Sequence, residues 1–287
     1  MLNVNLGPFA LQVSYLLMLA SMLVAFGVGH LAGRRQQTCI GNVLIDMVWG
    51  ALLAARIVFV AIWFDTYRDA AWSILDIRDG GFTPWAGLAT ALLVAIWHGW
   101  WRAALRKPLI LGLTAGALGW GVMWGVMSGA LGAGTSGTFG MANKPLLPPV
   151  ALSTLAGEPA TLAAIGKGQP MVVNLWASWC PPCRREMPVL AAAQQQETAV
   201  TFVFANQDED GATAQRYLSG GALSIANVLL DSGTALGRAV GATALPTTLF
   251  YDADGRLVDT HLGELSAASL TSKLNQLRTR TDLSTKE

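Results

Sequence analysis

VNLWASWCPPCRREMP, residues 173–188, decides the fold of the C-terminal part of this 287-residue chain. The apolar run Met171–Ala177 predicts a buried strand, and Pro182–Gln195 predicts a helix that starts beside Cys180 and Cys183. A Cys-x-x-Cys pair at a strand–helix junction indicates either redox chemistry or a metal site.

The sequence after this junction continues to alternate between strands and helices. In chain order we expect a strand at Val200–Ala205, a helix at Asp210–Leu218, a strand at Asn227–Leu230, a hairpin of Thr247–Asp252 and Leu257–His261 joined by Asp254-Gly255, and a helix with the apolar stripe Leu270, Leu274 and Leu277. Ser266 is suited to cap the last helix. The alternation implies parallel strands connected by helices, which is an α/β domain.

Thiol chemistry fits the positions of the two cysteines. A cysteine at the first turn of a helix faces the positive end of the helix dipole, which lowers its pKa from about 8.5 into the range of about 3.5 to 7.5. Cys180 is therefore the expected nucleophile. Cys183, one turn further, is the expected resolving thiol. Pro181 and Pro182 rigidify the loop between them.

Glu186 lies three residues after Cys183 on the same predicted helix face. A resolving thiol must lose its proton before it attacks, so Glu186 is a candidate acid/base that acts directly or through water. The alternative is an ordinary solvated helix residue.

Metal binding is the alternative for the cysteine pair. A closed zinc site needs four ligands, and this part of the chain offers one histidine, His261. We therefore expect no metal and no cofactor besides a redox-active Cys180–Cys183 disulfide. Cys39, the third cysteine, lies on the other side of the expected membrane and is interpreted as a buried bystander.

The composition of the whole chain indicates that part of it lies in lipid. Hydrophobic residues make up 53%, charged residues 13%, and the mean hydropathy is +0.44. The net charge is +1 and no basic cluster with interleaved aromatics occurs, which excludes nucleic acid as a partner.

Four apolar segments before residue 133 are each long enough to cross a membrane, which takes about 20 helical residues. They are Phe9–Leu31, Gly41–Phe64, Phe82–Ala104 and Pro108–Leu131. Because the charges Arg34 and Arg35 follow the first segment instead of preceding it, we expect it to stay uncleaved.

Loop charges predict the orientation of these spans. Basic residues follow the first span at Arg34 and Arg35 and the third at Arg102, Arg106 and Lys107, whereas the loop after the second contains Arg68 and Arg78. The two richer loops are therefore expected in the cytoplasm, with both termini outside it. In a bacterial cell the C-terminal part then lies on the oxidising, periplasmic side of the inner membrane.

Arg56 lies within the second predicted span. An arginine there costs roughly 2.5 kcal/mol or more, so it is a functional candidate. The alternative is that it snorkels to the outer surface or pairs with Asp65 or Asp79.

The run Val173–Pro188, together with Leu245-Pro246-Thr247 before the expected hairpin, resembles the TlpA/ResA/CcmG (DsbE-like) branch of membrane-anchored disulfide reductases. The resemblance covers roughly Leu152 to Arg280 and implies a thioredoxin-like fold. Thioredoxins proper place an aspartate at the position of Asn174. Glu186 is therefore the nearest titratable group in the motif, in agreement with an acid/base role.

The same resemblance implies a substrate-binding surface beside the cysteines. Pro246 would follow a cis peptide bond, and Leu245 would offer backbone groups to an extended substrate. Trp179, Pro181 and Pro182 would form the rim. The implied partners are protein disulfides in the periplasm and a membrane electron donor of the DsbD/CcdA kind.

The first half resembles the N-terminal part of prolipoprotein diacylglyceryl transferases. The matching segments are Leu6–Leu11, Ala55–Val60 and Asp79–Phe82, with Gly87-Leu88 beyond. Thr83–Gly87 departs from that family's histidine and second glycine pair, and its later half has no counterpart. The resemblance implies a truncated relative without transfer activity, in which Arg56 contacts a lipid headgroup.

These features divide the chain into a transmembrane domain at 1–133, a flexible linker rich in glycine and proline at 134–149, a thioredoxin-like domain at 150–280 and a tail at 281–287. The leading hypothesis is a multi-pass protein of the phospholipid bilayer that reduces protein disulfides in the periplasm. The alternative is a lipid-modifying or lipid-binding membrane protein with an appended redox domain.

Overall fold

The computed structural model describes residues 3–6, 9–34, 40–68, 74, 79–132 and 146–284. The chain divides into two compact units. The first comprises Met1–Asp65 and Gly81–Gly140, and the second comprises Thr66–Gly80 and Met141–Glu287. Cys39 and most of the expected linker lie outside the described residues, so the predictions for them are not addressed by the structure.

The first unit is built mainly of helices. Its elements are β1 Asn3–Leu6, β2 Phe9–Gln12, α1 Val13–Arg34, α2 Gly41–Ile62, α4 Pro84–Trp101 and α5 Ala103–Gly132, and the short α3 Phe64–Tyr67 spans the boundary to the second unit. Pro84 occupies the first turn of α4, where its missing N–H costs no hydrogen bond.

Helices α1 and α5 approach each other at small residues. A Cβ atom on Gly112 would lie 2.9 Å from the carbonyl oxygen of Ala25, and one on Gly116 would lie 2.8 Å from the Cβ of Ala25. Glycine four residues apart allows such close backbone contact, a common way to join helices in lipid.

Helices occupy most of each predicted span, but the first prediction was wrong at its start, because Phe9–Gln12 forms the strand β2 and α1 begins at Val13. Among the described residues one helix, Gly41–Ile62, is long and apolar enough to cross a membrane on length and composition. Membrane insertion of all four segments stays a prediction.

The second unit contains a seven-stranded sheet with the order β4-β3-β7-β6-β5-β8-β9. Its strands are β3 Leu152–Thr154, β4 Pro159–Ala160, β5 Met171–Trp176, β6 Thr201–Gln207, β7 Val228–Asp231, β8 Thr247–Tyr251 and β9 Leu257–Leu262. The predicted parallel pairing holds for β5, β6 and β7, whereas β8 pairs antiparallel to β5.

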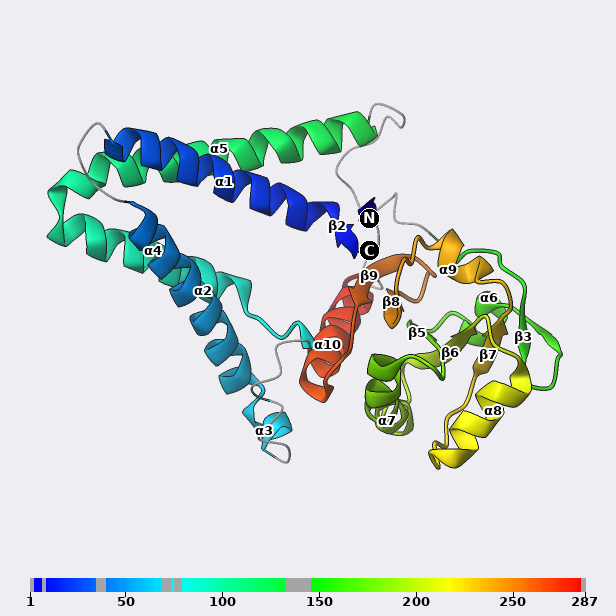
Figure 1. Ribbon diagram of the computed structural model, residues 1–287. Coiled ribbons are helices and arrows are strands. Elements are labelled where there is room, and N and C mark those ends of the chain that lie inside the picture. The colour runs from blue at the N-terminus through cyan, green and yellow to red at the C-terminus, as the bar shows by residue number, and fades with distance from the viewer. Residues whose placement is uncertain are drawn as a thin grey trace. The chain divides into compact units, whose positions relative to one another are not determined.

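Helices cover both faces of this sheet (Figure 1). One face packs against α7 Pro181–Gln196, α8 Gly211–Gly220 and α10 Ala267–Ser284, and the other against α6 Leu162–Gly166 and α9 Ala235–Ala239. Because side chains alternate along a strand, Val172 faces the first core and Val173 the second, and both are fully buried.

The α/β prediction for this unit is confirmed, including the hairpin β8–β9, in which Gly255 adopts a φ of 74° that glycine tolerates. Ser266 accepts a hydrogen bond from the N–H of Ser269, as expected of a cap for α10. The elements β3, β4, α6 and α9 were not predicted, because each is five residues or shorter and shows no clear period.

Candidate active site

The cysteine pair lies where β5 ends and α7 begins. Cys180 is the N-cap residue of α7, and its Sγ accepts a hydrogen bond from the N–H of Cys183 at 3.3 Å. The two residues form a disulfide, with a Cα–Cα distance of 5.3 Å. The first turn of the helix therefore directs a backbone N–H and the positive end of the helix dipole at the sulfur of Cys180.

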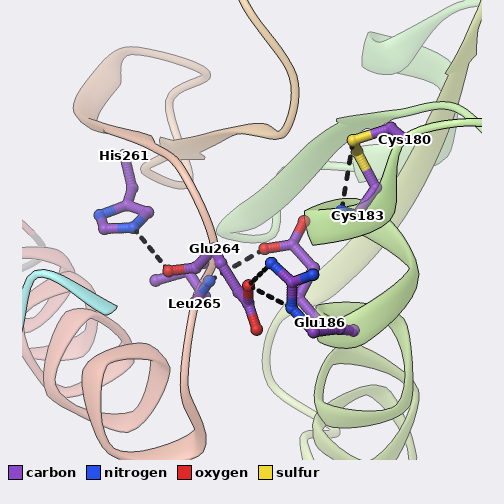
Figure 2. Close-up of polar contacts among 7 residues, drawn as sticks. Cys180, Cys183, Glu186, His261, Glu264 and Leu265 are labelled. Carbon is purple, nitrogen blue, oxygen red and sulfur yellow. Dashed lines mark hydrogen bonds and ion pairs between the residues drawn. A yellow bond between two sulfur atoms is a disulfide. The ribbon is translucent and has the colours of Figure 1, made fainter. Parts of the chain in front are cut away.

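Glu186 is fully buried, which excludes the solvated alternative. Its Oε1 accepts a hydrogen bond from Asn174 Nδ2 at 2.7 Å, and its Oε2 accepts one from the N–H of Leu265 at 3.0 Å. Figure 2 shows the carboxyl group between the helix that carries Cys183 and the segment that carries Leu265.

Burial raises the pKa of Glu186 to about 7, because removal from water disfavours the charged form. The hydrogen bonds from Leu265 and Asn174 act in the opposite direction, and the nearby charge of Glu264 adds to the rise. A carboxyl group with such a pKa can both take up and release a proton at neutral pH.

Asn174 connects this carboxyl group to the sheet. Its Nδ2 also donates to Thr248 Oγ1 at 3.0 Å, and its Oδ1 has no hydrogen-bond partner among the described residues. The sequence did not predict Thr248 as the partner of Asn174 or Leu265 as the partner of Glu186. They lie 62 and 79 residues beyond Glu186 in the chain, and no local pattern indicates the contact.

A groove with a cavity volume of about 310 Å³ lies beside the cysteines. Trp179 and Leu245, two of the predicted substrate-binding residues, line it together with Asp208 and Arg238. Trp179 is 67% exposed, so its indole ring forms an apolar rim.

The three predicted prolines do not line this groove in the described part of the chain. Pro181 is exposed and Pro182 half-buried in the first turn of α7, whereas Pro246 is buried. The peptide bond between Leu245 and Pro246 is cis, as the resemblance implied.

Within the described residues no group of three or more histidine, cysteine, aspartate or glutamate side chains could hold a metal ion. The ring of His261 contacts the carbonyl oxygen of Glu264 at 3.3 Å. Burial lowers the pKa of His261, since the charged form loses hydration, and the charge of Lys273 adds to this.

Arg56 lies in the first unit, in α2, and is 9% exposed. Its Nη1 donates to the carbonyl oxygen of Gly81 at 2.9 Å, and its guanidinium lies 5.9 Å from the ring centre of Phe82. Asp79, one of the two acids considered as its partner, accepts hydrogen bonds from Tyr67 and from Ser266 within the second unit.

Known thiol–disulfide exchange proteins are similar to part of this chain. The Redoxin family model matches residues 141–277. The thiol:disulfide interchange protein HelX of Rhodobacter capsulatus is 32% identical over 131 residues, which are 45% of this chain and 73% of HelX. The thiol:disulfide interchange protein DsbE of Pseudomonas fluorescens biotype C is 33% identical over 123 residues, 43% of this chain and 67% of DsbE.

A third relative is the thiol-disulfide oxidoreductase ResA of Halalkalibacterium halodurans, which is 32% identical over 117 residues. The match covers 40% of this chain and 65% of ResA, so the chain spans just under two thirds of that relative.

Proposed function

Since the chain belongs to the thiol–disulfide oxidoreductases that include HelX and DsbE, we propose that it reduces protein disulfides outside the cytoplasm while its first half holds it in the inner membrane. The observation that carries this proposal is the Cys180–Cys183 disulfide at the amino end of α7, with the buried carboxyl group of Glu186 on the same helix.

In the first step the thiolate of reduced Cys180 attacks one sulfur of a substrate disulfide. A bond forms between Cys180 Sγ and that sulfur, the substrate S–S bond breaks, and the released thiolate takes a proton from water. The N–H of Cys183 and the dipole of α7 stabilise the attacking thiolate relative to the thiol.

In the second step the thiol of Cys183 passes its proton to the carboxylate of Glu186, directly or through water. The Cys183 thiolate then attacks Cys180 Sγ, the Cys180–substrate bond breaks, and the substrate leaves as a second thiolate, which takes a proton from water. The substrate has gained two electrons, and the protein has gained the Cys180–Cys183 disulfide. A pKa of about 7 suits Glu186 to this proton transfer at neutral pH.

The groove beside the disulfide supports binding of an extended substrate segment. Trp179 and Leu245 line it, so apolar side chains of the substrate can pack on the indole ring while backbone groups near Leu245 meet its main chain. Pro181 and Pro182 restrict the conformation of the loop between the cysteines.

The proposed location is a bacterial inner membrane with the thioredoxin-like domain on the periplasmic side. The loop charges and the apolar segments support it. A membrane electron donor of the DsbD/CcdA kind would return the Cys180–Cys183 disulfide to two thiols. A lipid-headgroup contact at Arg56 stays a prediction.

Trapping of the mixed disulfide tests the exchange reaction. The Cys183→Ala variant, expressed in cells as the full chain, should accumulate covalent adducts at Cys180 that reducing agent releases. Cys180→Ala should form none, and Cys39→Ala serves as the matched control that exchanges normally. The proposal would be contradicted if Cys183→Ala formed no adducts and turned over substrate as fast as the unsubstituted chain.

The direction of electron flow is tested by the redox potential. A potential near that of thioredoxin, about −270 mV, supports a reductase. A value near about −120 mV is that of a strong oxidant and would overturn this direction.

A further inference from the structure

Glu209, in the loop between β6 and α8, reaches across to the segment that leads into the active-site helix. Its Oε2 accepts a hydrogen bond from the backbone N–H of Ser178 at 2.8 Å, and its Oε1 accepts one from the hydroxyl group of the same residue. Two hydrogen bonds from one residue to one carboxylate fix both the position and the orientation of that residue.

Ser178 lies inside the turn that carries the nucleophile. The N–H of Cys180 donates to the carbonyl oxygen of Ala177 at 3.2 Å, so Ser178 and Trp179 are the two middle residues of this turn. A shift of Ser178 therefore moves the indole ring of Trp179 on the rim and the sulfur of Cys180 at the N-cap of α7.

The sheet places Glu209 at this position. Strands β5 and β6 are parallel, with Trp176 opposite Asn206, so their carboxyl ends meet at one edge. The active-site turn follows β5 and the Glu209 loop follows β6 at that same edge. The separation of 31 residues between Ser178 and Glu209 hides this contact in the sequence.

Asn206, in β6, also binds the carboxylate of Glu209. Its side chain is fully buried, and its Nδ2 donates to Glu209 Oε2 at 2.6 Å. Its Oδ1 has no hydrogen-bond partner among the described residues. Burying an amide oxygen without a hydrogen-bond partner lowers stability. This cost favours a role for Asn206 in which its Nδ2 group is needed to hold the carboxylate of Glu209.

The neighbouring acid, Asp210, shows what a purely structural role looks like here. Its carboxylate accepts a hydrogen bond from the N–H of Thr213 at 2.7 Å and caps α8, the helix that begins at the next residue. In the described part of the chain the hydrogen bonds of Glu209 go instead to Ser178 and Asn206, with no ion pair to a cation.

We propose that Glu209 is a positioning residue for thiol–disulfide exchange, which holds the Ser178 turn so that Cys180 stays at the amino end of α7. This inference rests on the proposed function. It assigns no contact between Glu209 and the substrate, because the carboxylate acts through Ser178.

The test compares Glu209→Ala and Glu209→Gln with the matched control Asp210→Ala, all as full chains in detergent that also carry Cys39→Ala. One readout is the rate at which the reduced protein attacks 5,5′-dithiobis(2-nitrobenzoate). The other is the pH midpoint for alkylation of Cys180 by iodoacetamide, measured by mass spectrometry after Cys183→Ala is added.

We expect Glu209→Ala to slow the attack about tenfold and to raise the alkylation midpoint, because Cys180 loses its fixed place at the helix N-terminus and with it the thiolate fraction. Glu209→Gln keeps an acceptor for the N–H of Ser178 and should recover most of the rate. Asp210→Ala should match the Cys39→Ala reference in both readouts, although it loses its helix cap.

The inference is overturned if Glu209→Ala matches the reference in both rate and alkylation midpoint, or if Asp210→Ala loses as much as Glu209→Ala does. A reference protein that exchanges no disulfide at all would instead refute the proposed function. The two failures are thus distinguishable.

Discussion

Replacement of Glu186 by glutamine removes a buried carboxyl group that titrates near neutral pH. Burial raises its pKa from 4.5 to about 7, so the folded state binds the proton more tightly than the unfolded state does. Between these values the unfolded state carries fewer protons, and the free energy of unfolding therefore falls as the pH rises. The stabilising contribution is complete below the unfolded pKa and is lost above the folded one.

The size of the effect follows from the pKa change. At about 1.4 kcal/mol for each tenfold change in the ionisation constant, a rise from 4.5 to about 7 corresponds to about 3 kcal/mol. The Glu186 side chain is fully buried, so water does not screen this energy away. The free energy of unfolding of the wild type should therefore fall by about 3 kcal/mol, relative to that of Glu186→Gln, as the pH rises from about 4.5 to about 8.

Pulse proteolysis of the oxidised full chain in urea and detergent measures this difference across the pH range. Glu197→Gln is the matched control, since Glu197 lies at the other end of α7, where it pairs with Arg278 near the surface. An exposed pair contributes little, so this variant should show no comparable pH dependence. A stability difference for Glu186→Gln that stays constant with pH would refute a raised pKa.

The same variant also tests the proton transfer. Release of substrate from the mixed disulfide should slow by about 100-fold in Glu186→Gln, a typical cost for the loss of an acid/base group. In the wild type the rate of release should increase with pH and show an inflection near pH 7, and the profile of the variant should lack this inflection. An unchanged release rate would exclude Glu186 as the proton acceptor of Cys183.

Three further predictions test helix packing in each of the two units and the cap of α8. Leu190→Ala, at a fully buried position of α7, should lower the free energy of unfolding by about 3 kcal/mol in urea titrations, and a loss below about 1 kcal/mol would contradict the packing described. Gly112→Leu should separate α5 from α1 and lower the melting temperature in detergent, whereas Gly121→Leu meets open space and should leave it unchanged. Asp210→Ala should lower the urea midpoint at neutral pH, and its midpoint should converge with that of the wild type as the pH falls. The reason is that the N–H of Thr213 holds the pKa of the Asp210 carboxyl group below its usual range. A difference in midpoint that persists in acid would argue against the cap.

Much of the second unit could be predicted from local pattern. The apolar run before Cys180 predicts Met171–Ala177 and the structure has β5 at Met171–Trp176, while the predicted helix Pro182–Gln195 is α7 at Pro181–Gln196. These segments are long, and their hydrophobic period matches one type of element. The short β3 and β4 carry too few residues for a period and were missed.

The sequence by itself determined the thiol pair and its position at the start of a helix, because both depend on residues within a few positions of Cys180. Only the tertiary structure decided the environment of Glu186. Asn174 and the backbone of Leu265 reach its carboxyl group when β5 and the segment before α10 pack against α7, and that packing both buries the group and raises its pKa. The bond from Ser178 to Glu209 has the same origin, since parallel pairing of β5 and β6 brings together loops that lie far apart in the chain.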